Sequence, residues 1–386
     1  MIYKRIVLLF VFFYALIVFI GGCSSEKDNS EPPAPLVELS SSLNFKQLWS
    51  ANAGGGSEEA YTKIAPAFHN EQLFTASPTG IVRAFNFSDG KLLWEKQVNV
   101  QISGGPGIGN GLVVVGSHKG EVVALSETDG TELWRAQVSS EVLAKPRISD
   151  EIVVVRTIDG KLYAFDSGSG IQSWIYERNR VPLFTLRGTS TPVIKQDLII
   201  AGFDNGKIAA LELQTGKVLW EAPVAVPSGR TQLERMVDID ADPLLVDDTV
   251  YVTSTNGRTI AIDLVLGKLL WEKDLSSYAG LGVDADYLYL TDTKSHVWAL
   301  ERDSGQEWWK QEKLQARAVT APVNIGDYVV VGDFEGYLHW MRREDGKLVA
   351  RYKMGSSSII VPPLVIDDIL VAYDSSGKMV ALQVEE

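Results

Sequence analysis

The sequence predicts an all-β protein: an eight-bladed β-propeller of four-stranded blades, closed by its N-terminal strand. The first observation behind this fold class is an internal repeat with a period of about 40 residues. In the clearest copy, residues 192–220, a Pro, Gly206, Ala210, Gly216 and a Trp stand at fixed steps. The same steps recur, intact or degraded, in further copies that begin at Pro66, Pro106, Pro146, Pro243, Leu281, Pro322 and Pro363.

The second observation is the periodicity within each copy. Residues 197–202 and 206–211 are short apolar runs that stop at Gly, Asn or Asp, as strands do. Between them, Asn205-Gly206 is a hairpin dipeptide, since Asn and Gly tolerate the positive φ of a tight turn. Each copy therefore reads as three strands, and its Gly-x-x-x-Trp segment adds a fourth. Four-stranded units at this period are typical of propeller blades.

The third observation is how the two ends of the chain complement each other. Trp49 has no repeat before it, and the last copy ends at Ala381 without a Trp segment. The strand around Trp49 is therefore expected to complete the last blade, which gives eight blades and a ring without an open edge. The Trp of each copy has a large apolar area and a ring N–H, and it is expected to cover the junction between blades.

Residues 1–22 are predicted to be a targeting segment. A basic pair precedes an apolar run over residues 6–20, which is shorter than the roughly 18 residues of a membrane span. Two glycines and Cys23 follow. The segment resembles the bacterial lipoprotein signal, in which the cysteine is acylated and becomes the mature N-terminus; a short transmembrane anchor is the alternative. In such signals Ser24 after the cysteine implies sorting to the outer membrane.

Residues 23–44 are predicted to comprise the lipidated Cys23 and a flexible tether. Residues 24–42 are rich in Ser, Pro and Glu and show no core pattern. Several acyl chains together would give stable anchoring to the membrane. The propeller is expected to take up residues 45–386.

Composition and charge exclude several classes of function. The net charge is −13, so the basic footprint of a nucleic-acid-binding protein is missing. Cys23 is the single cysteine, which excludes an intramolecular disulfide and a Cys-based zinc site. The four histidines stand in different repeats without metal-ligand spacing, and no nucleophile-elbow, phosphate-loop or dinucleotide motif is present. The sequence therefore predicts no catalytic residue, no cofactor and no metal.

The candidate binding site follows from the lengths of the links between repeats. The step from the first Pro to the Trp is constant, so the length variation falls between one Trp and the next Pro. In a propeller these links lie on one face, which is often the binding face. The two longest links, residues 175–191 and 221–242, flank the same repeat and are expected to be neighbours in space.

The first long link has the composition of a protein-binding hot spot. It carries Leu183, Phe184 and Leu186 beside Arg187. We expect Leu186 and Phe184 to enter a pocket of a partner and Arg187 to set the orientation. The alternative is that these apolar groups pack under the blade.

The second long link sets Asp238, Asp240 and Asp242 at alternate positions. As a calcium loop it is poor, because Pro243 stands at the sixth position, where such loops have Gly. As an acidic rim it would give a partner charge complementarity and register. The alternative is a structural cluster that caps strand ends and pairs with Arg235.

The repeat unit resembles that of two known families. Residues 124–134, with Ala124, Gly130 and Trp134, resemble the tryptophan-docking repeat of quinoprotein dehydrogenases. Those enzymes hold pyrroloquinoline quinone and calcium, typically against a disulfide of adjacent cysteines, and residues 45–386 contain no cysteine. The combination of lipoprotein signal, tether and eight-bladed ring is similar to the BamB family, lipoproteins of the outer-membrane β-barrel assembly machine.

The two long links carry the finer resemblance to the BamB family. Residues 183–188 look like the family's Leu-x-Leu-Arg-Gly stretch, with Phe in place of a leucine, and residues 238–240 look like its Asp-x-Asp stretch. In that family these loops contact a periplasmic POTRA domain of the central barrel-assembly protein. The resemblance therefore implies partner-binding roles for Phe184, Leu186, Arg187, Asp238 and Asp240.

The expected function is that of a non-catalytic scaffold, lipid-anchored to the outer membrane on its periplasmic face. The resemblance implies binding to POTRA domains, indirect contact with the other lipoproteins of the assembly machine, and assistance to the insertion of barrel proteins. Unfolded barrel precursors are expected as further clients, captured as added strands at exposed blade edges. The alternatives are a quinone-dependent dehydrogenase and a periplasmic propeller that binds glycan or another protein.

Overall fold

The computed structural model describes residues 31–56, 63–177, 190–231 and 234–385. The chain divides into two compact units, Met1–Pro32 and Pro33–Glu386, and only Glu31 and Pro32 of the first are described. All that follows concerns the second unit. No helix in the described part of the chain is long and apolar enough to cross a membrane.

The described residues form eight antiparallel sheets of four strands each. Blades 1 to 4 consist of β2(Ala67–His69), β3(Gln72–Ala76), β4(Ile81–Asn86), β5(Leu92–Gln97); β6(Ile102–Gly109), β7(Leu112–Ser117), β8(Glu121–Ser126), β9(Glu132–Gln137); β10(Arg147–Ser149), β11(Ile152–Arg156), β12(Leu162–Asp166), β13(Gln172–Tyr176); and β14(Val193–Lys195), β15(Leu198–Gly202), β16(Lys207–Glu212), β17(Val218–Pro223). Blades 5 to 8 consist of β18(Leu244–Val246), β19(Thr249–Thr253), β20(Thr259–Asp263), β21(Leu269–Lys273); β22(Leu281–Val283), β23(Tyr287–Thr291), β24(Val297–Glu301), β25(Glu307–Gln311); β26(Val323–Ile325), β27(Tyr328–Gly332), β28(Tyr337–Arg342), β29(Leu348–Lys353); and β30(Leu364–Ile366), β31(Ile369–Tyr373), β32(Lys378–Glu385), β1(Asn44–Asn52).

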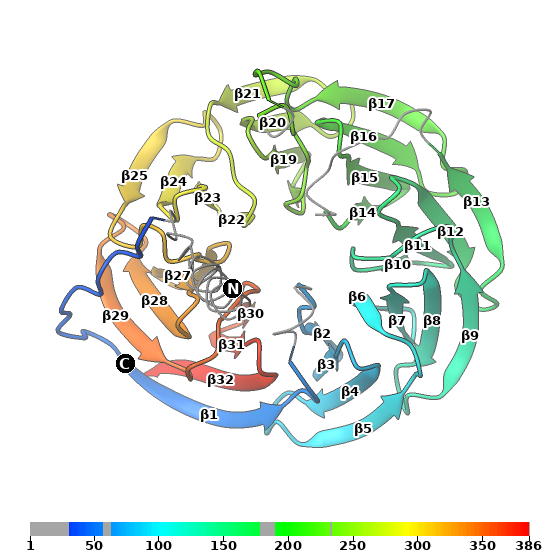
Figure 1. Ribbon diagram of the computed structural model, residues 1–386, viewed down its shortest axis with the longest axis horizontal. Helices are drawn as coiled ribbons and strands as arrows, with labels where there is room; N and C mark the ends of the chain where they lie inside the picture. The colour runs from blue at the N-terminus through cyan, green and yellow to red at the C-terminus, as the bar shows by residue number, and fades with distance from the viewer. Residues whose placement is uncertain (1–30, 57–62, 178–189, 232–233, 386) are drawn as a thin grey trace, which may run out of the picture. The chain divides into compact units, whose positions relative to one another are not determined.

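The eight blades stand around a common axis, as Figure 1 shows, with the first strand of each blade innermost and the fourth outermost. Each blade is a simple meander, because every strand pairs antiparallel with the one before it. The hairpin between β15 and β16 uses the predicted dipeptide, and Gly206 has a φ of 73° there. The predicted eight-bladed propeller of four-stranded blades is confirmed.

The ring closes through the two ends of the propeller. Strand β1 pairs antiparallel with β32, from Asn44 opposite Glu385 to Asn52 opposite Lys378. The first strand of the propeller thus lies outermost in the blade that contains the last three (Figure 1). This confirms the prediction that the segment around Trp49 completes the eighth blade.

The conserved spacing of Gly and Trp in the repeats has a direct structural cause. The indole of Trp220 in blade 4 covers Gly267 of blade 5, where an added Cβ would lie 2.6 Å from the ring. Its ring N–H donates to the Leu264 carbonyl at 2.9 Å. We name this contact a tryptophan latch and the glycine under the indole the latch Gly. Seven latches join a blade to the next one, and their tryptophans are Trp49, Trp94, Trp134, Trp174, Trp220, Trp271 and Trp309.

Blade 7 inverts the pair of residues that underlies the latch. In blade 4 the small Ala210 stands opposite Trp220 across strands β16 and β17. In blade 7 the large residue is Trp340 on β28, and the small one is Ala350 on β29. The volume of the pair is kept, and Trp340 is fully buried against Phe45 of β1, with ring centroids 5.0 Å apart.

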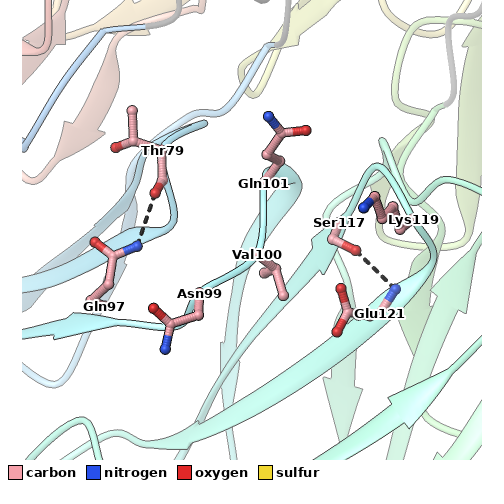
Figure 2. Close-up of a pocket in the computed structure, with 8 residues that line it drawn as sticks. All are labelled: Thr79, Gln97, Asn99, Val100, Gln101, Ser117, Lys119 and Glu121. Atoms are coloured by element: carbon pink, nitrogen blue, oxygen red, sulfur yellow. Dashed lines mark hydrogen bonds between the residues drawn. The ribbon is translucent and has the colours of Figure 1, made fainter.

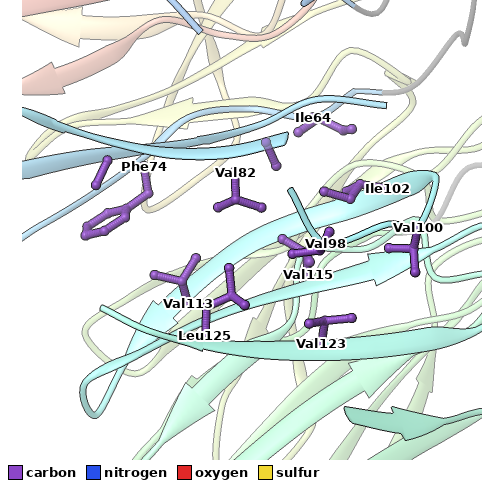
Figure 3. Close-up of a cluster of buried hydrophobic side chains, with 12 residues drawn as sticks. Ile64, Phe74, Val82, Val98, Val100, Ile102, Val113, Val115, Val123 and Leu125 are labelled. Atoms are coloured by element: carbon purple, nitrogen blue, oxygen red, sulfur yellow. The ribbon is translucent and has the colours of Figure 1, made fainter. Parts of the chain in front are cut away.

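The core of the ring lies between neighbouring blades. Figure 3 shows the cluster between blades 1 and 2, where Phe74 and Val82 face Val113, Val115 and Val123. Short β-branched residues suit such a layer, because they pack closely on the pleated faces of two sheets. The eight sheets therefore stabilise one another through both faces, which is why strands such as β7 are continuous runs of buried residues.

The meander assigns the connections to two opposite faces of the ring. The links between blades and the turns between second and third strands lie at one end of the strands, which we name the loop face. The turns between first and second strands and between third and fourth strands lie at the other end, which we name the turn face. On the loop face each link packs between two turns; Ile239, for example, donates its N–H to Phe203 and Thr255 donates to Asp238.

Residues 33–43 run along blade 7 before β1 begins. We name this segment the N-terminal strap. Hydrogen bonds hold it: Ala34 N to Gln315 O (2.9 Å), Arg317 Nη1 to Ala34 O (3.0 Å), Arg351 Nη2 to Val37 O (3.3 Å) and Ser42 N to Val349 O (3.0 Å). The flexible tether expected over residues 23–44 is therefore fixed to the ring from Ala34 onward, while residues 23–30 lie outside the described part.

A buried charged group lies under the strap. Asp333 accepts hydrogen bonds from Arg317 Nε and from His339 Nε2, both at 2.8 Å, and all three side chains are buried. Burial lowers the pKa of His339, and the nearby charges of Arg351 and Arg317 add to this effect against the attraction of Asp333. The folded protein therefore favours the neutral imidazole.

This lowered pKa predicts a loss of stability in mild acid. Unfolded histidine takes up a proton as the pH falls through about 6.5, whereas folded His339 does so only at lower pH. The stability is thus fully present above that value and decreases below it, by up to about 1.4 kcal/mol per pH unit. Urea unfolding at pH 7.5 and 5.5 should show a smaller decrease in the His339→Gln variant than in the wild type. An equal decrease in both proteins would assign the acid sensitivity to other groups.

Candidate docking surface at the long links

The two longest links meet on the loop face, as expected from their positions on either side of blade 4. The backbone N–H of Thr191, at the end of the first link, donates to Asp242 Oδ1, at the end of the second, at 2.6 Å. Ile239 packs over Gly202 of β15, where Ser190 also approaches. The two links are therefore joined directly at their C-terminal ends.

The buried side chain of Arg156 stabilises the place where the two links meet. It stands at the end of β11 in blade 3, and its side chain has no exposed surface. Its Nη1 donates to the carbonyl and the hydroxyl of Ser190 at 3.0 and 2.8 Å, and its Nη2 pairs with Asp204 at 2.9 Å. The guanidinium also lies over the Phe203 ring, 5.6 Å from its centroid. One buried cation thus ties the first long link to the second–third strand turn of blade 4.

The five predicted partner-binding residues fall into three groups. Phe184, Leu186 and Arg187 lie outside the described residues. Asp238 is only 1% exposed, so its side chain supports the second link from inside and does not form an acidic rim. Asp240 is half-buried, and Thr255 donates to its Oδ2 at 3.1 Å. Of the two carboxylates, the structure leaves only Asp240 within reach of a partner.

Asp240 also lines a cavity of ≈ 470 Å³ at the loop-face end of the ring axis. The lining comes largely from the last residues of the links and includes Lys63, Lys145 and Tyr278. Lys63 lies 5.8 Å from the centroid of the Tyr278 ring and donates to the Tyr278 carbonyl. The mouth of the axis therefore presents both cations and carboxylates beside apolar link residues.

Burial shifts the pKa values of two titratable groups at this mouth. Burial raises the pKa of Asp240, against the hydrogen bond from Thr255 and the charges of Arg156 and Lys63. Burial lowers the pKa of Lys145 to about 8, and the charge of Arg147 adds to the effect. Because these groups are already partly desolvated, a partner that covers them loses less hydration than it would at fully exposed charges.

The chemistry of this surface is that of recognition. Within residues 31–56, 63–177, 190–231 and 234–385, no three His, Cys, Asp or Glu side chains gather in a metal-binding arrangement. The geometry brings together a hydrogen-bonded pair of links, the half-buried Asp240, the exposed Asp242 and a charged axial mouth. These are the elements of an interface with a rigid support.

A second hollow on the loop face, between blades 1 and 2, is lined by polar residues apart from Val100. Its volume is ≈ 340 Å³, and Figure 2 shows Thr79, Gln97, Ser117, Lys119 and Glu121 among the residues that line it. Gln97 donates to the Thr79 carbonyl and Glu121 N–H to the Ser117 hydroxyl, at 2.9 Å in each case. These polar groups already satisfy one another, so the hollow serves below as a control surface.

Sequence reasoning missed Arg156. At the equivalent position, four residues before the Gly of the second–third strand turn or its replacement, the other repeats have an uncharged residue: Ala76, Gly116, Gly202, Thr253, Thr291, Gly332 or Tyr373. A charge at a position that is uncharged in seven other repeats was the signal that could have found it.

Comparison with known proteins identifies the family. A family model described as outer membrane protein assembly factor BamB matches residues 78–311. A relative of that name from Kangiella koreensis is 45% identical over 368 residues, which cover 95% of this chain and 94% of the relative. The chain belongs to the BamB family.

A solved structure agrees with this assignment. BamB from Moraxella catarrhalis matches with a TM-score of 0.80 and 27% sequence identity, covering 88% of this chain and 100% of that one. The expected resemblance to the BamB family is thereby confirmed, including its repeat and its eight-bladed ring.

The quinoprotein resemblance concerns the fold alone. The quinohemoprotein alcohol dehydrogenase from Comamonas testosteroni matches with a TM-score of 0.69 but only 12% identity, covering 88% of this chain and 76% of that enzyme. The curated relatives carry the name of an assembly factor. This member of the BamB family is not an enzyme.

Proposed function

We propose that the protein is a scaffold in outer-membrane protein assembly that binds a POTRA domain of the central barrel-assembly protein through its two long links. The relatives named as outer membrane protein assembly factors support the general role. The resemblance of residues 183–188 and 238–240 to the family's partner-binding stretches supports the site. Other lipoproteins of the machine are then reached indirectly, and unfolded barrel precursors are brought to the central protein.

The observation that carries this proposal is the hydrogen bond between Thr191 and Asp242. It joins the ends of the two links at 2.6 Å, and Arg156 fixes Ser190 beside them. A loop whose ends are held loses less conformational entropy on binding than a free loop of the same length. Leu186 and Phe184 would then enter a pocket of the POTRA domain, while Arg187 and Asp240 set the orientation. Asp238 would act as a support of the second link.

Binding of purified POTRA domains, measured by isothermal titration calorimetry, tests the proposal. Leu186→Ala or Arg187→Ala should weaken binding by about 30-fold or more, which corresponds to about 2 kcal/mol at a hot spot. Asp240→Ala should weaken binding less, because Asp240 is already half-buried. Its carboxylate also accepts a hydrogen bond from Thr255 and interacts with the charge of Lys63. Thermal unfolding of each variant separates lost contacts from lost folding.

Lys119→Ala is the matched control, since Lys119 lies on the same face in the polar hollow of blades 1 and 2. Its affinity should equal that of the wild type. Full-strength binding by both Leu186→Ala and Arg187→Ala would rule out this site, as would an equal loss in the Lys119→Ala variant.

The proposed location is the periplasmic side of the outer membrane. It rests on Cys23, which follows the apolar segment and is the single cysteine of the chain. Cys23 lies outside the described residues, and its acylation stays a prediction. The family is one of outer-membrane assembly factors, which fits this location.

A further inference from the structure

One turn of the ring differs from all its equivalents. Between the third and fourth strands, seven blades carry two residues before the latch Gly, and in six of them these residues are polar or Gly. In blade 5 they are Val265 and Leu266. The other six pairs are Ser88-Asp89, Thr128-Asp129, Gly168-Ser169, Gln214-Thr215, Asp303-Ser304 and Glu344-Asp345.

Both side chains point into solvent on the turn face. Val265 is 67% exposed and Leu266 is 70% exposed. Leu269 and Leu270 of β21 follow and are also exposed. On the adjoining blade, Trp220 of β17 covers Gly267 in this turn. We name Val265, Leu266, Leu269 and Leu270 the blade-5 patch.

The fold itself does not require the two apolar residues. The turn is built by Asp263, whose Oδ1 accepts the N–H groups of Val265 and Leu266 at 3.0 and 2.7 Å. In blade 1, Asn86 builds the same kind of turn, its Oδ1 accepting the Ser88 N–H at 2.9 Å. Since polar residues serve in the other turns, exposed Val and Leu gain nothing for the isolated ring and leave apolar area in water.

In blades 1 and 7 the lysine after the Gly of this turn has an ion-pair partner that blade 5 lacks. In blade 1 Lys91 pairs with Asp89 at 2.7 Å, and in blade 7 Lys347 pairs with Asp345 at 2.9 Å. Lys268 stands at the equivalent place in blade 5, where Leu266 has replaced the aspartate, and it forms no ion pair with any described residue.

The carboxylates near Lys268 are already engaged. Asp263 accepts the N–H groups of the turn, Asp248 pairs with Lys195 at 3.1 Å, and Asp247 pairs with Arg302 at 3.6 Å. The nearest first–second strand turn therefore cannot easily supply the missing carboxylate. Within an acidic protein of net charge −13, Lys268 lies beside the apolar side chains of the blade-5 patch and has no ion-pair partner among the described residues.

We propose that the blade-5 patch is a docking site for a second protein, one that presents an apolar side chain next to a carboxylate. The apolar group would cover Val265 and Leu266, and the carboxylate would take the place that Asp89 holds beside Lys91 in blade 1. Another copy of the same patch does not fit, because the patch contains no carboxylate that could pair with Lys268 of the other copy. The patch lies on the turn face, opposite the long links, so both sites can be occupied together.

A defined peptide tests the recognition chemistry. The probe is a fluorescein-labelled peptide in which leucine alternates with glutamate, and its binding to the full chain is followed by anisotropy. Val265→Ser combined with Leu266→Asp gives blade 5 the turn sequence of blade 1, and it should weaken binding at least tenfold at an unchanged melting temperature. Lys268→Glu should have a similar effect. A peptide with lysine in place of glutamate should bind the wild type more weakly.

Crosslinking in the producing cells identifies the partner. A photoreactive amino acid at Leu270 should give a discrete protein adduct, and one at Leu93, the equivalent position in blade 1, should not. The adduct should decrease at least fivefold with the Val265→Ser, Leu266→Asp pair, and its mapped segment should hold an aspartate or glutamate beside an apolar residue. The proposal is overturned by equal adducts at Leu270 and Leu93, by an adduct with lipid or a second copy, or by peptide binding that survives Lys268→Glu. POTRA binding by the turn variant should be unchanged, which keeps this test separate from that of the long links.

Discussion

Ending the chain at Gly377, which removes β32, should abolish cooperative folding of the ring. Strand β32 pairs with β31 on one side and with β1 on the other, so its loss leaves β1 unpaired, exposes one edge of β31 and opens the ring. It also removes Met379, Val380 and Leu382, all fully buried. At about 1.5–3 kcal/mol each, these side chains account for about 5–9 kcal/mol, which is comparable to the whole stability of a typical domain. Circular dichroism should show no sharp thermal transition.

A shorter truncation provides the control. Ending the chain at Gln383 removes its last three residues, of which Val384 and Glu385 pair with the first two residues of β1. Most of the β1–β32 pairing then remains, and the melting temperature should stay within a few degrees of the wild type. A synthetic peptide of residues 378–385 should restore structure to the chain that ends at Gly377. A sharp transition at the wild-type temperature in that chain would mean that the ring does not depend on this closure.

Replacing Arg156 with Met should cost about 3–5 kcal/mol of unfolding free energy, the cost of breaking a buried ion pair by removing one partner. Met fills part of the volume but leaves Asp204 without its guanidinium partner in a dry site, and Ser190 without two hydrogen bonds. The first long link would also lose its support, so POTRA binding should decrease as well. Urea unfolding monitored by tryptophan fluorescence measures the stability.

Two further variants make this result interpretable. Adding Asp204→Asn to Arg156→Met removes the buried charge and should recover a large part of the lost stability. Arg83→Met is the matched exposed case, because the Arg83–Glu95 pair lies at the surface and should contribute no more than about 1 kcal/mol. If Arg156→Met costs no more than Arg83→Met, the buried pair is not what holds the junction.

The fold could be predicted because its signals repeat. Five intact repeats carry Gly and Trp at the same positions, and Trp49 at the start matches the missing segment after Ala381. The reason for the latch Gly could not be read from one repeat, since it depends on the indole of the preceding blade. Gly267, for example, is required both by its φ of 64° and by Trp220 lying against it.

The candidate site could be predicted only in part. Link length placed residues 175–191 and 221–242 together, and Thr191 and Asp242 confirm this. Alternate spacing could not tell Asp238 from Asp240, because the burial of each depends on turns of two other blades. Thr255 contacts both of them, through the Asp238 carbonyl and the Asp240 carboxylate. Arg156 comes from a third blade, so no local pattern connects it with the link that it supports.

The seven tryptophan latches all run in the same direction along the chain. Each of these seven indoles lies against a turn of the following blade, as Trp94 does beside Glu127 and Trp220 beside Leu264. A newly made chain that emerges N-terminus first therefore exposes each indole until one more repeat has appeared. Maturation then advances from one end to the other, and the period in which a chaperone can engage the nascent protein lasts until its final residues are released.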